Sequence, residues 1–423
     1  MNWLARLYYH YRRTLKAIKL FFIISGPGII VMLADNDAGG ITTYAATGAK
    51  YGYHLIWFLL LLLPVAYYVQ EMTVRLGAVT KRGHAEAIFE SFGSFWGWFS
   101  LLDLFLVDWL TLVTEFIGMT AALSIFHIPP LLTVIMVCLL MGFMVLRGRY
   151  WTWEKVALVF CALNAVYIPC AFLVKPSLSE IVHLGLVPHW PGGSTNDLFF
   201  LLMANIGTTI APWMIFFQQS SVVDKGLLEK DIKFGQLDTL IGSAFTVLVA
   251  IFIVVVTGTV LRGVEINSAA QAIELLIENH NQYVGCLLAI GLFNAGLLGA
   301  ICISLASSWA FGEVFGWAHS LNNRIKEAPW FYVCYFFTLI SAGLVVLIPG
   351  APLVLITLFV QVIAVTLLPS ALVFLILLLN DEQVMGRYKN TLMQNVISWT
   401  IVITIVILST LYALSALFPS MFN

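Results

Sequence analysis

Long apolar segments recur along almost the whole of this sequence, and they restrict the chain to a membrane. A helix needs about 20 mostly apolar residues to cross the hydrocarbon core of a bilayer. Hydrophobic residues make up 61% of the 423 positions and charged residues only 10%, whereas about 25% of residues in soluble domains are charged. The mean hydropathy is +0.94. The sequence therefore predicts an all-α, multi-pass membrane protein.

Eleven segments are long and apolar enough to be membrane spans. They are residues 20–48, 54–78, 95–126, 129–146, 153–174, 196–222, 236–261, 282–316, 329–348, 352–379 and 393–418. The connecting segments are too short for a separate extramembrane domain. We therefore expect residues 1–423 to form a single polytopic unit.

The distribution of Lys and Arg predicts the orientation of this unit. If residues 1–19 are a cytoplasmic tail, all but three of the 21 basic residues lie on the inner side; the exceptions are Lys50, Lys175 and Arg262. Inner loops of membrane proteins carry such an excess of Lys and Arg. If the number of spans were wrong, the Lys and Arg residues would be spread over both sides of the membrane. We therefore predict a plasma-membrane protein with a cytoplasmic N-terminus and an external C-terminus.

Composition and motifs argue against several other classes of protein. The net charge of −1 gives no indication of a nucleic-acid partner, and the six cysteines have no ligand spacing. The sequence also lacks a His-x-x-His motif, a paired set of catalytic carboxylates and a cofactor motif. A receptor would need a sensing domain for which the chain has no room. We therefore predict that the protein is not an enzyme and holds no cofactor. We also expect it to be a monomer.

The first apolar span is interrupted by polar residues and glycines. Residues 26–28 read Gly-Pro-Gly, and residues 34–40 read Ala-Asp-Asn-Asp-Ala-Gly-Gly. A charge at the bilayer centre costs several kcal/mol or more, and unwound backbone at that depth must be buried in protein or line a watery cavity. A broken helix that carries Asp35 and Asp37 is typical of a cation site in a transporter. The alternative is a kinked structural helix whose aspartates are hydrogen-bonded.

A second interruption lies in the sixth span, where residues 205–214 read Asn-Ile-Gly-Thr-Thr-Ile-Ala-Pro-Trp-Met. Broken helices at corresponding positions of two halves indicate an inverted repeat with the substrate site between them. The five-span separation predicts a 5+5 arrangement, with repeats at 20–174 and 196–379 and an extra helix at 393–418. Freed carbonyl oxygens, a carboxylate and water suit a hard cation. Because no Lys or Arg lies near either break, we favour a cation over an anion.

These motifs resemble those of the Nramp divalent-metal transporters, which share the LeuT-type fold. The likeness begins with the first break and with Tyr-Gly-Tyr at 51–53, and it continues through later spans. Its further parts are Gln70, Leu76-Gly77, Glu115 to Gly118, Gly207 to Pro212, Gln361, Leu368-Pro369 and Met385 to Asn390. The resemblance implies a transporter for divalent metal ions.

Both breaks depart from the family pattern. The family reads Asp-Pro-Gly-Asn at the first break, where the Asp and Asn bind the metal, whereas this chain has Gly in place of the Asn. At the second break the family has Met-Pro-His, with a metal-binding sulfur, and this chain has Ala-Pro-Trp. Two roles are open for Asp35: it binds or attracts the ion, or it caps a half-helix. Two roles are open for Gln361 as well: it approaches the ion, or it makes a hydrogen bond between two helices. The metal-site residues that the resemblance implies are Ala34, Asp35, Asp37, Gly40, Thr208, Ala211 and Gln361.

These departures predict a change of substrate. A thioether favours soft or borderline ions such as Mn²⁺ and Cd²⁺, whereas Mg²⁺ keeps several waters and binds one or two carboxylates. Loss of the Asn and Met side chains makes the site larger and richer in oxygen. The chain thus resembles the Nramp-related magnesium transporters, and we expect Mg²⁺ as substrate, with Mn²⁺ also accepted.

The family's proton pathway is depleted as well. Its proton-handling Asp maps onto Leu112, its His onto Trp213, and the arginines that face that Asp are missing from 330–335. Glu115 remains, and we favour a structural role for it over a coupling role. Glu71 would add negative potential to an ion vestibule. The alternatives are proton-coupled Mn²⁺ or Fe²⁺ uptake of the usual Nramp type, or a carrier of the same fold for organic cations or amino acids.

Overall fold

The protein is described by a computed structural model that covers residues 21, 23–146, 149–188, 191–192, 194–266 and 268–417. Within these ranges the secondary structure is helical and contains no strand. The predicted tail, residues 1–19, lies outside the described residues.

Helical segments coincide with all eleven predicted spans. The first five are α2 (Pro27–Ala34) with α3 (Ala38–Tyr51), α4 (Ile56–Thr80), α6 (Ser94–Ser124), α7 (Pro130–Leu146) and α8 (Tyr150–Leu163) with α9 (Tyr167–Leu173). The remaining six are α11 (Thr195–Gly207) with α12 (Pro212–Lys225), α13 (Ile232–Val260), α15 (Gln282–Phe315), α16 (Pro329–Val346), α17 (Leu353–Asn380) and α19 (Leu392–Leu417). Short helices connect them: α5 (His84–Phe92), α10 (Leu178–Glu180), α14 (Ala269–Asn279) and α18 (Glu382–Met385).

The span lengths agree with a polytopic membrane protein. Eight helical stretches of the described residues are long and apolar enough to cross a bilayer. The broken first span, α6 and the shorter α7 are the other three helical segments in the predicted set. The fifth span differs from the prediction of one continuous helix, because a 3₁₀ turn at Asn164–Val166 separates α8 from α9.

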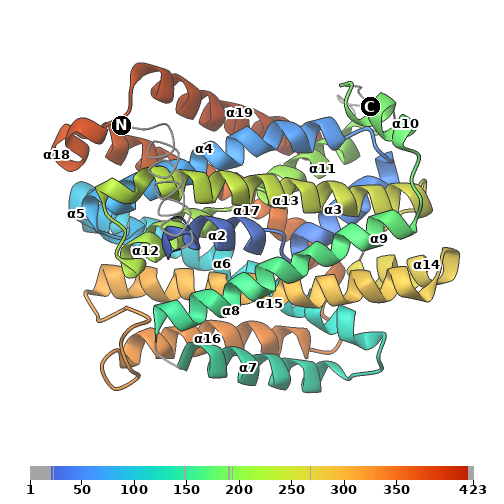
Figure 1. The fold of residues 1–423 in the computed structure, drawn as a ribbon, viewed down its shortest axis with the longest axis horizontal. Coiled ribbons are helices and arrows are strands. Elements are labelled where there is room, and N and C mark those ends of the chain that lie inside the picture. Colours follow the sequence, from blue (N-terminus) through green and yellow to red (C-terminus); the bar gives the residue numbers. More distant parts are fainter. Residues whose placement is uncertain are drawn as a thin grey trace, which may run out of the picture.

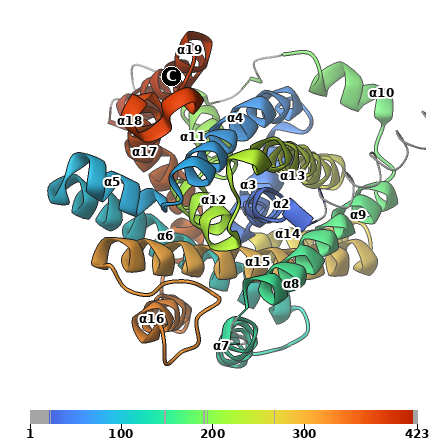
Figure 2. The same cartoon turned by 60° about the vertical axis from the view of Figure 1, so that its left-hand side comes forward.

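The two broken spans lie in the middle of the molecule. In Figure 1, α2 and α3 run between α13 on one side and α15 on the other, while α19 and the α7–α16 pair lie at opposite edges. In Figure 2, turned by 60° from that view, helices α8, α12, α13 and α15 lie around α2, and each of them contacts it. The breaks are therefore shielded from lipid, as unwound backbone in a membrane must be.

Local sequence explains where the half-helices begin. Pro27 and Pro212 are the first residues of α2 and α12, a position where the missing N–H of proline is not needed. Small residues then bring α2 and α3 close to α13. A Cβ atom on Gly28 would lie 2.6 Å from the Thr239 backbone nitrogen, and one on Gly48 would lie 2.5 Å from the Val254 carbonyl oxygen. Glycines at such contacts allow helix backbones in membranes to approach closely.

Candidate metal site between the two breaks

The first break is a buried turn that joins α2 to α3. Asp35, Asn36 and Asp37 form this turn, and all three side chains are buried. Asp37 has an extended backbone, and its Oδ1 accepts a hydrogen bond from the Gly40 amide at 2.6 Å. Asp37 is thus the N-cap of α3, where a carboxylate also interacts favourably with the helix dipole.

Asp35 is the C-cap of α2, with its backbone amide bonded to the Val31 carbonyl, whereas the N-cap of α3 is Asp37. Asn36 donates from Nδ2 to the Thr246 carbonyl of α13 at 3.1 Å. The Asp35 Oδ2 atom is buried and has no hydrogen-bond partner in the described part of the chain. Asp35 thus remains a candidate ligand or attractor for a cation.

Two backbone carbonyls at the breaks lack their usual helical donors. In a continuous helix the amide of residue 38 would bond to the Ala34 carbonyl, but the Ala38 amide donates to Glu115 Oε2 at 3.0 Å. Pro212 has no N–H to give to the Thr208 carbonyl, which accepts from the Tyr44 hydroxyl at 3.3 Å. The sequence therefore places two carbonyl oxygens where a hard cation could use them.

The two breaks lie directly against each other. The Thr208 hydroxyl faces the first turn of α3, because a Cβ atom on Gly40 would overlap it. The Tyr44 hydroxyl of α3 also lies 3.3 Å from Thr209 Oγ1. The predicted proximity of Asp37, Gly40 and Thr208 is therefore present in the structure.

Gln361 of α17 contacts both breaks. A Cβ atom on Gly39 would overlap its Nε2 atom, and one on Gly207 would overlap its carbonyl oxygen. Its Nε2 atom has no hydrogen-bond partner among the described residues. Gln361 therefore lies at the predicted position, with its side-chain amide against the start of α3.

Several buried polar atoms around the breaks share this lack of a partner. In the described part of the chain they include Asp35 Oδ2, Asn36 Oδ1, Glu115 Oε1, Asn205 Oδ1, Thr208 Oγ1, Trp213 Nε1 and Gln361 Nε2. Buried polar atoms in proteins are nearly always paired with protein, water or an ion. No group of three or more His, Cys, Asp and Glu residues within the described ranges could hold a metal ion. A cation here would therefore be held by one or two carboxylates with neutral oxygens and water.

Glu115 and Asp108 of α6 have separate partners. Glu115 bonds to the start of α3, as described above, and Asp108 Oδ2 accepts from Ser307 of α15 at 2.6 Å. Gly299 of α15 makes room for the first pair, because a Cβ atom there would lie 3.0 Å from Glu115 Oε2 and 3.1 Å from Asp37 Cβ. Glu115 Oε2 is thus hydrogen-bonded to the start of α3, and a structural role for Glu115 stays a prediction.

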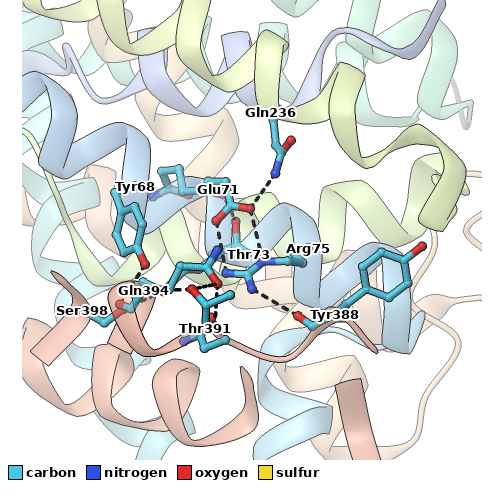
Figure 3. Close-up of polar contacts among 12 residues, drawn as sticks. Tyr68, Glu71, Thr73, Arg75, Gln236, Tyr388, Thr391, Gln394 and Ser398 are labelled. Carbon is cyan, nitrogen blue, oxygen red and sulfur yellow. Dashed lines mark hydrogen bonds and ion pairs between the residues drawn. The ribbon is translucent and has the colours of Figure 1, made fainter. Parts of the chain in front are cut away.

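Glu71 does not supply the negative potential expected from the sequence. Figure 3 shows it paired with Arg75 one turn away on α4, with 3.2 Å between Arg75 Nε and Glu71 Oε1. Gln236 of α13 donates to the same carboxylate at 2.8 Å, and Arg75 reaches the Tyr388 carbonyl at 3.1 Å. The ion pair therefore neutralises Glu71 and connects α4 with α13 and the segment before α19.

Sequence reasoning missed a second polar cluster, at the start of α2. Asp238 of α13 accepts from the Gly26 and Gly28 amides at 3.1 and 2.7 Å. Lys225 Nζ lies 2.6 Å from Glu154 Oε1 and 2.9 Å from the Ser25 carbonyl. An aspartate within a predicted span was a usable signal, since a helix that starts after Gly-Pro has free amides for an anion.

Comparison with known proteins agrees with this geometry. The model of the family described as natural resistance-associated macrophage protein-like, Nramp, matches residues 28–415. The chain belongs to the Nramp family. This Nramp chain is 26% identical to the divalent metal cation transporter MntH of Staphylococcus saprophyticus, over 92% of this chain and 91% of that protein. It is 25% identical to a natural resistance-associated macrophage protein 2 homologue of Dictyostelium discoideum, over 90% of this chain and 61% of that protein.

Solved structures show the same fold at lower identity. The Eremococcus coleocola manganese transporter aligns with a TM-score of 0.77 and 20% identity, over 92% of this chain and 86% of that one. MhsT, solved with L-phenylalanine, aligns with a TM-score of 0.61 and 12% identity, over 92% and 98%. The LeuT-type fold is thereby confirmed. Membership of the Nramp family also confirms a membrane transporter for divalent metal ions rather than an enzyme.

Proposed function

We propose that this Nramp protein is a secondary transporter that takes up Mg²⁺ as a largely hydrated ion and also accepts Mn²⁺. The proposal rests on the donors at the two breaks: the Asp37 carboxylate and neutral oxygens, with glycine at 40 and alanine at 211 where the family pattern has an amide and a thioether. Mg²⁺ is typically bound through one or two carboxylates and keeps several waters. Glycine and alanine offer no side-chain donor of their own, so water would supply the rest of the coordination.

The polar atoms of the site support an oxygen-rich shell. The carbonyls of Ala34 and Thr208 lack their helical donors, and the Thr208 hydroxyl has no partner in the described chain. The side-chain amide of Gln361 would contribute its oxygen, since the oxygen and nitrogen of an amide are assigned from hydrogen bonding. Asp35 completes the shell as a second carboxylate or attracts the ion through water.

We further propose that uptake does not require proton entry. Leu112 is buried where the family pattern has a proton-handling Asp, and Trp213 packs 6.1 Å from the Phe217 ring, within a buried aromatic cluster. Helix α16 contains no Lys or Arg. One charge that crosses 100 mV is worth about 2.3 kcal/mol, so two charges supply about 4.6 kcal/mol, or about three decades of concentration. The membrane potential alone is therefore a sufficient driving force.

Proton-coupled uptake of Mn²⁺ or Fe²⁺ is the second candidate. Two observations favour it: the relatives are named as divalent metal and manganese transporters, and Glu115 is retained beside Asp37. The two candidates differ in their preferred ion and in whether uptake moves protons.

We also keep as proposals a monomer in the plasma membrane, with a cytoplasmic N-terminus, an external C-terminus and repeats at 20–174 and 196–379. Cysteine accessibility tests the orientation. A cysteine placed at Glu265 should react with an impermeant reagent added outside cells, whereas one at Glu229 should react only after permeabilisation. The reverse pattern would contradict the orientation.

Competition uptake tests the proposed substrate. Purified protein in liposomes should take up Mg²⁺, and both Mn²⁺ and unlabelled Mg²⁺ should reduce this uptake, with Ca²⁺ measured in parallel. Liposomes with the Asp37→Ala variant are the control and should show only leak. Uptake of Mn²⁺ without any uptake of Mg²⁺ would contradict the proposed substrate and favour the second candidate.

A further inference from the structure

A thioether lies at the second break, although the sequence comparison removes one from position 211. Met214 Sδ is 3.3 Å from the Ala211 amide nitrogen and accepts its hydrogen bond. The Met214 side chain is fully buried. The sulfur is thus supplied from three residues further along the chain.

The start of α12 explains this position. Ala211 is the N-cap and Met214 the third residue of the helix. In a capping box, the side chain of that third residue, usually Glu or Gln, bends back to the N-cap amide. Here a thioether occupies the place of the carboxylate or amide. The geometry of the helix start therefore directs the sulfur back to the Ala211 amide, at the end of the second break.

Trp213 does not occupy the same space. Its ring packs against Phe217, which in turn lies 5.6 Å from Trp309 of α15. The side chain that replaces the family's His thus belongs to an aromatic cluster with α15. The sulfur of Met214 and the unpartnered hydroxyl of Thr208 belong to the break itself.

We propose that Met214 is a specificity-determining residue that offers a soft donor to Mn²⁺ and Cd²⁺ but not to Mg²⁺. This inference rests on the proposed location of the metal site between the two breaks. A thioether is a weak hydrogen-bond acceptor, and methionine has three rotatable bonds, so the sulfur can leave the Ala211 amide for a soft cation. A hydrated Mg²⁺ ion has no use for sulfur. One site can therefore accept a hard ion through oxygen and water and a softer ion through Met214.

Two substitutions separate a ligand from a helix cap. Met214→Leu conserves volume and removes the sulfur, whereas Met214→Gln keeps an acceptor for the Ala211 amide and replaces soft sulfur by hard oxygen. Met203→Leu is the matched control, since Met203 is another buried methionine, on α11 of the same span. Mg²⁺ uptake into liposomes is measured with increasing external Cd²⁺ or Mn²⁺.

Both Met214 variants should need at least fivefold more Cd²⁺ for half-inhibition, with a smaller shift for Mn²⁺. The shift is measured relative to each variant's own Mg²⁺ uptake, and all values for the control Met203→Leu should stay within twofold of the parent. Unchanged Cd²⁺ inhibition in Met214→Gln would overturn the inference, and so would an equal loss of affinity for all three ions, which indicates a cap alone. If the parent takes up Mn²⁺ but no Mg²⁺, the proposal of Mg²⁺ as substrate is wrong. The role of Met214 is then still tested by measuring how Cd²⁺ inhibits Mn²⁺ uptake in the parent and the same variants.

Discussion

The two ends of α2 are equally buried and rich in polar groups, but they differ in how those groups are paired. At the N-terminal end, Asp238 accepts the free amides of the helix and Glu154 is paired with Lys225. At the C-terminal end, Asp35 Oδ2 and Thr208 Oγ1 have no partner in the described chain. The carboxylates at the N-terminal end are saturated by protein, although Ser25 Oγ there has no partner in the described chain, whereas those at the C-terminal end are not.

This difference distinguishes an anchor from a binding site. A buried polar group costs free energy unless something pairs with it, so saturated groups hold the fold and unsaturated ones need water or a ligand. The N-terminal cluster attaches α2 to α13 and α12. The unpartnered atoms of the C-terminal cluster lie at the two breaks, which contact each other. Substitutions at the two ends should therefore have opposite effects on transport and stability.

The largest expected effect is the loss of transport when the charge of Asp37 is removed. Asp37→Ala should abolish Mg²⁺ and Mn²⁺ uptake, because no other carboxylate is certain to face the ion. Asp37→Asn should do the same while it keeps an acceptor for the Gly40 amide, and its thermal stability without metal should match that of the parent. Near-normal Mg²⁺ uptake by either variant would remove Asp37 from the site.

The next effect concerns selectivity at the unsaturated end. Ala211→Met combined with Gly40→Asn restores the family's sulfur and amide, and should lower the ratio of Mg²⁺ to Mn²⁺ uptake by about tenfold, equivalent to about 1.4 kcal/mol. A Cβ atom at residue 40 would lie 3.2 Å from Asp37 Oδ1 and would displace the Thr208 hydroxyl, so the cavity narrows and hydrated Mg²⁺ is excluded. Each single variant is the control. An unchanged ratio in the double variant would count against the assigned site.

A smaller effect on transport is expected at the saturated end. Asp238→Asn removes the charge that binds the Gly26 and Gly28 amides, and hydrogen bonds to charged groups contribute about 1.5–3 kcal/mol. The melting temperature should fall equally with and without Mg²⁺, while uptake per folded protein falls by less than an order of magnitude. Thermal unfolding in detergent and liposome uptake measure the two quantities. Abolished transport with unchanged stability would show that this end also takes part in binding.

The sequence was sufficient for features encoded locally. Both breaks are visible in it because Pro, Gly and Asp interrupt apolar segments, and the breaks contain Asp37, Gly40 and Thr208, which the family resemblance implies as site residues. The eleven predicted spans follow from segment length alone. The turn at Asn164 escaped prediction because residues 153–174 read as a continuous apolar segment.

The features that escaped prediction depend on contacts between distant segments or on side-chain direction. Tyr44 contacts Thr208, and Asp238 contacts Gly26, across more than 160 residues in each pair. Their partners cannot be read from spacing within one helix. Met214 is local, but its sulfur reaches the break only because Ala211 is a helix cap. Glu71 was expected to add negative potential, but Arg75, one helical turn away, pairs with it and neutralises its charge.

The central claim is uptake of Mg²⁺ at an oxygen-rich break without proton entry, and simultaneous recording of Mg²⁺ uptake and internal pH in liposomes tests it most directly. Uptake should increase with an inside-negative potential, should not respond to an imposed pH gradient, and should leave the internal pH unchanged. The Asp37→Ala variant is the control for leak. Mg²⁺-dependent acidification in the parent that is absent from this control would contradict the account and would direct attention to Glu115 or Asp108 as the proton carrier.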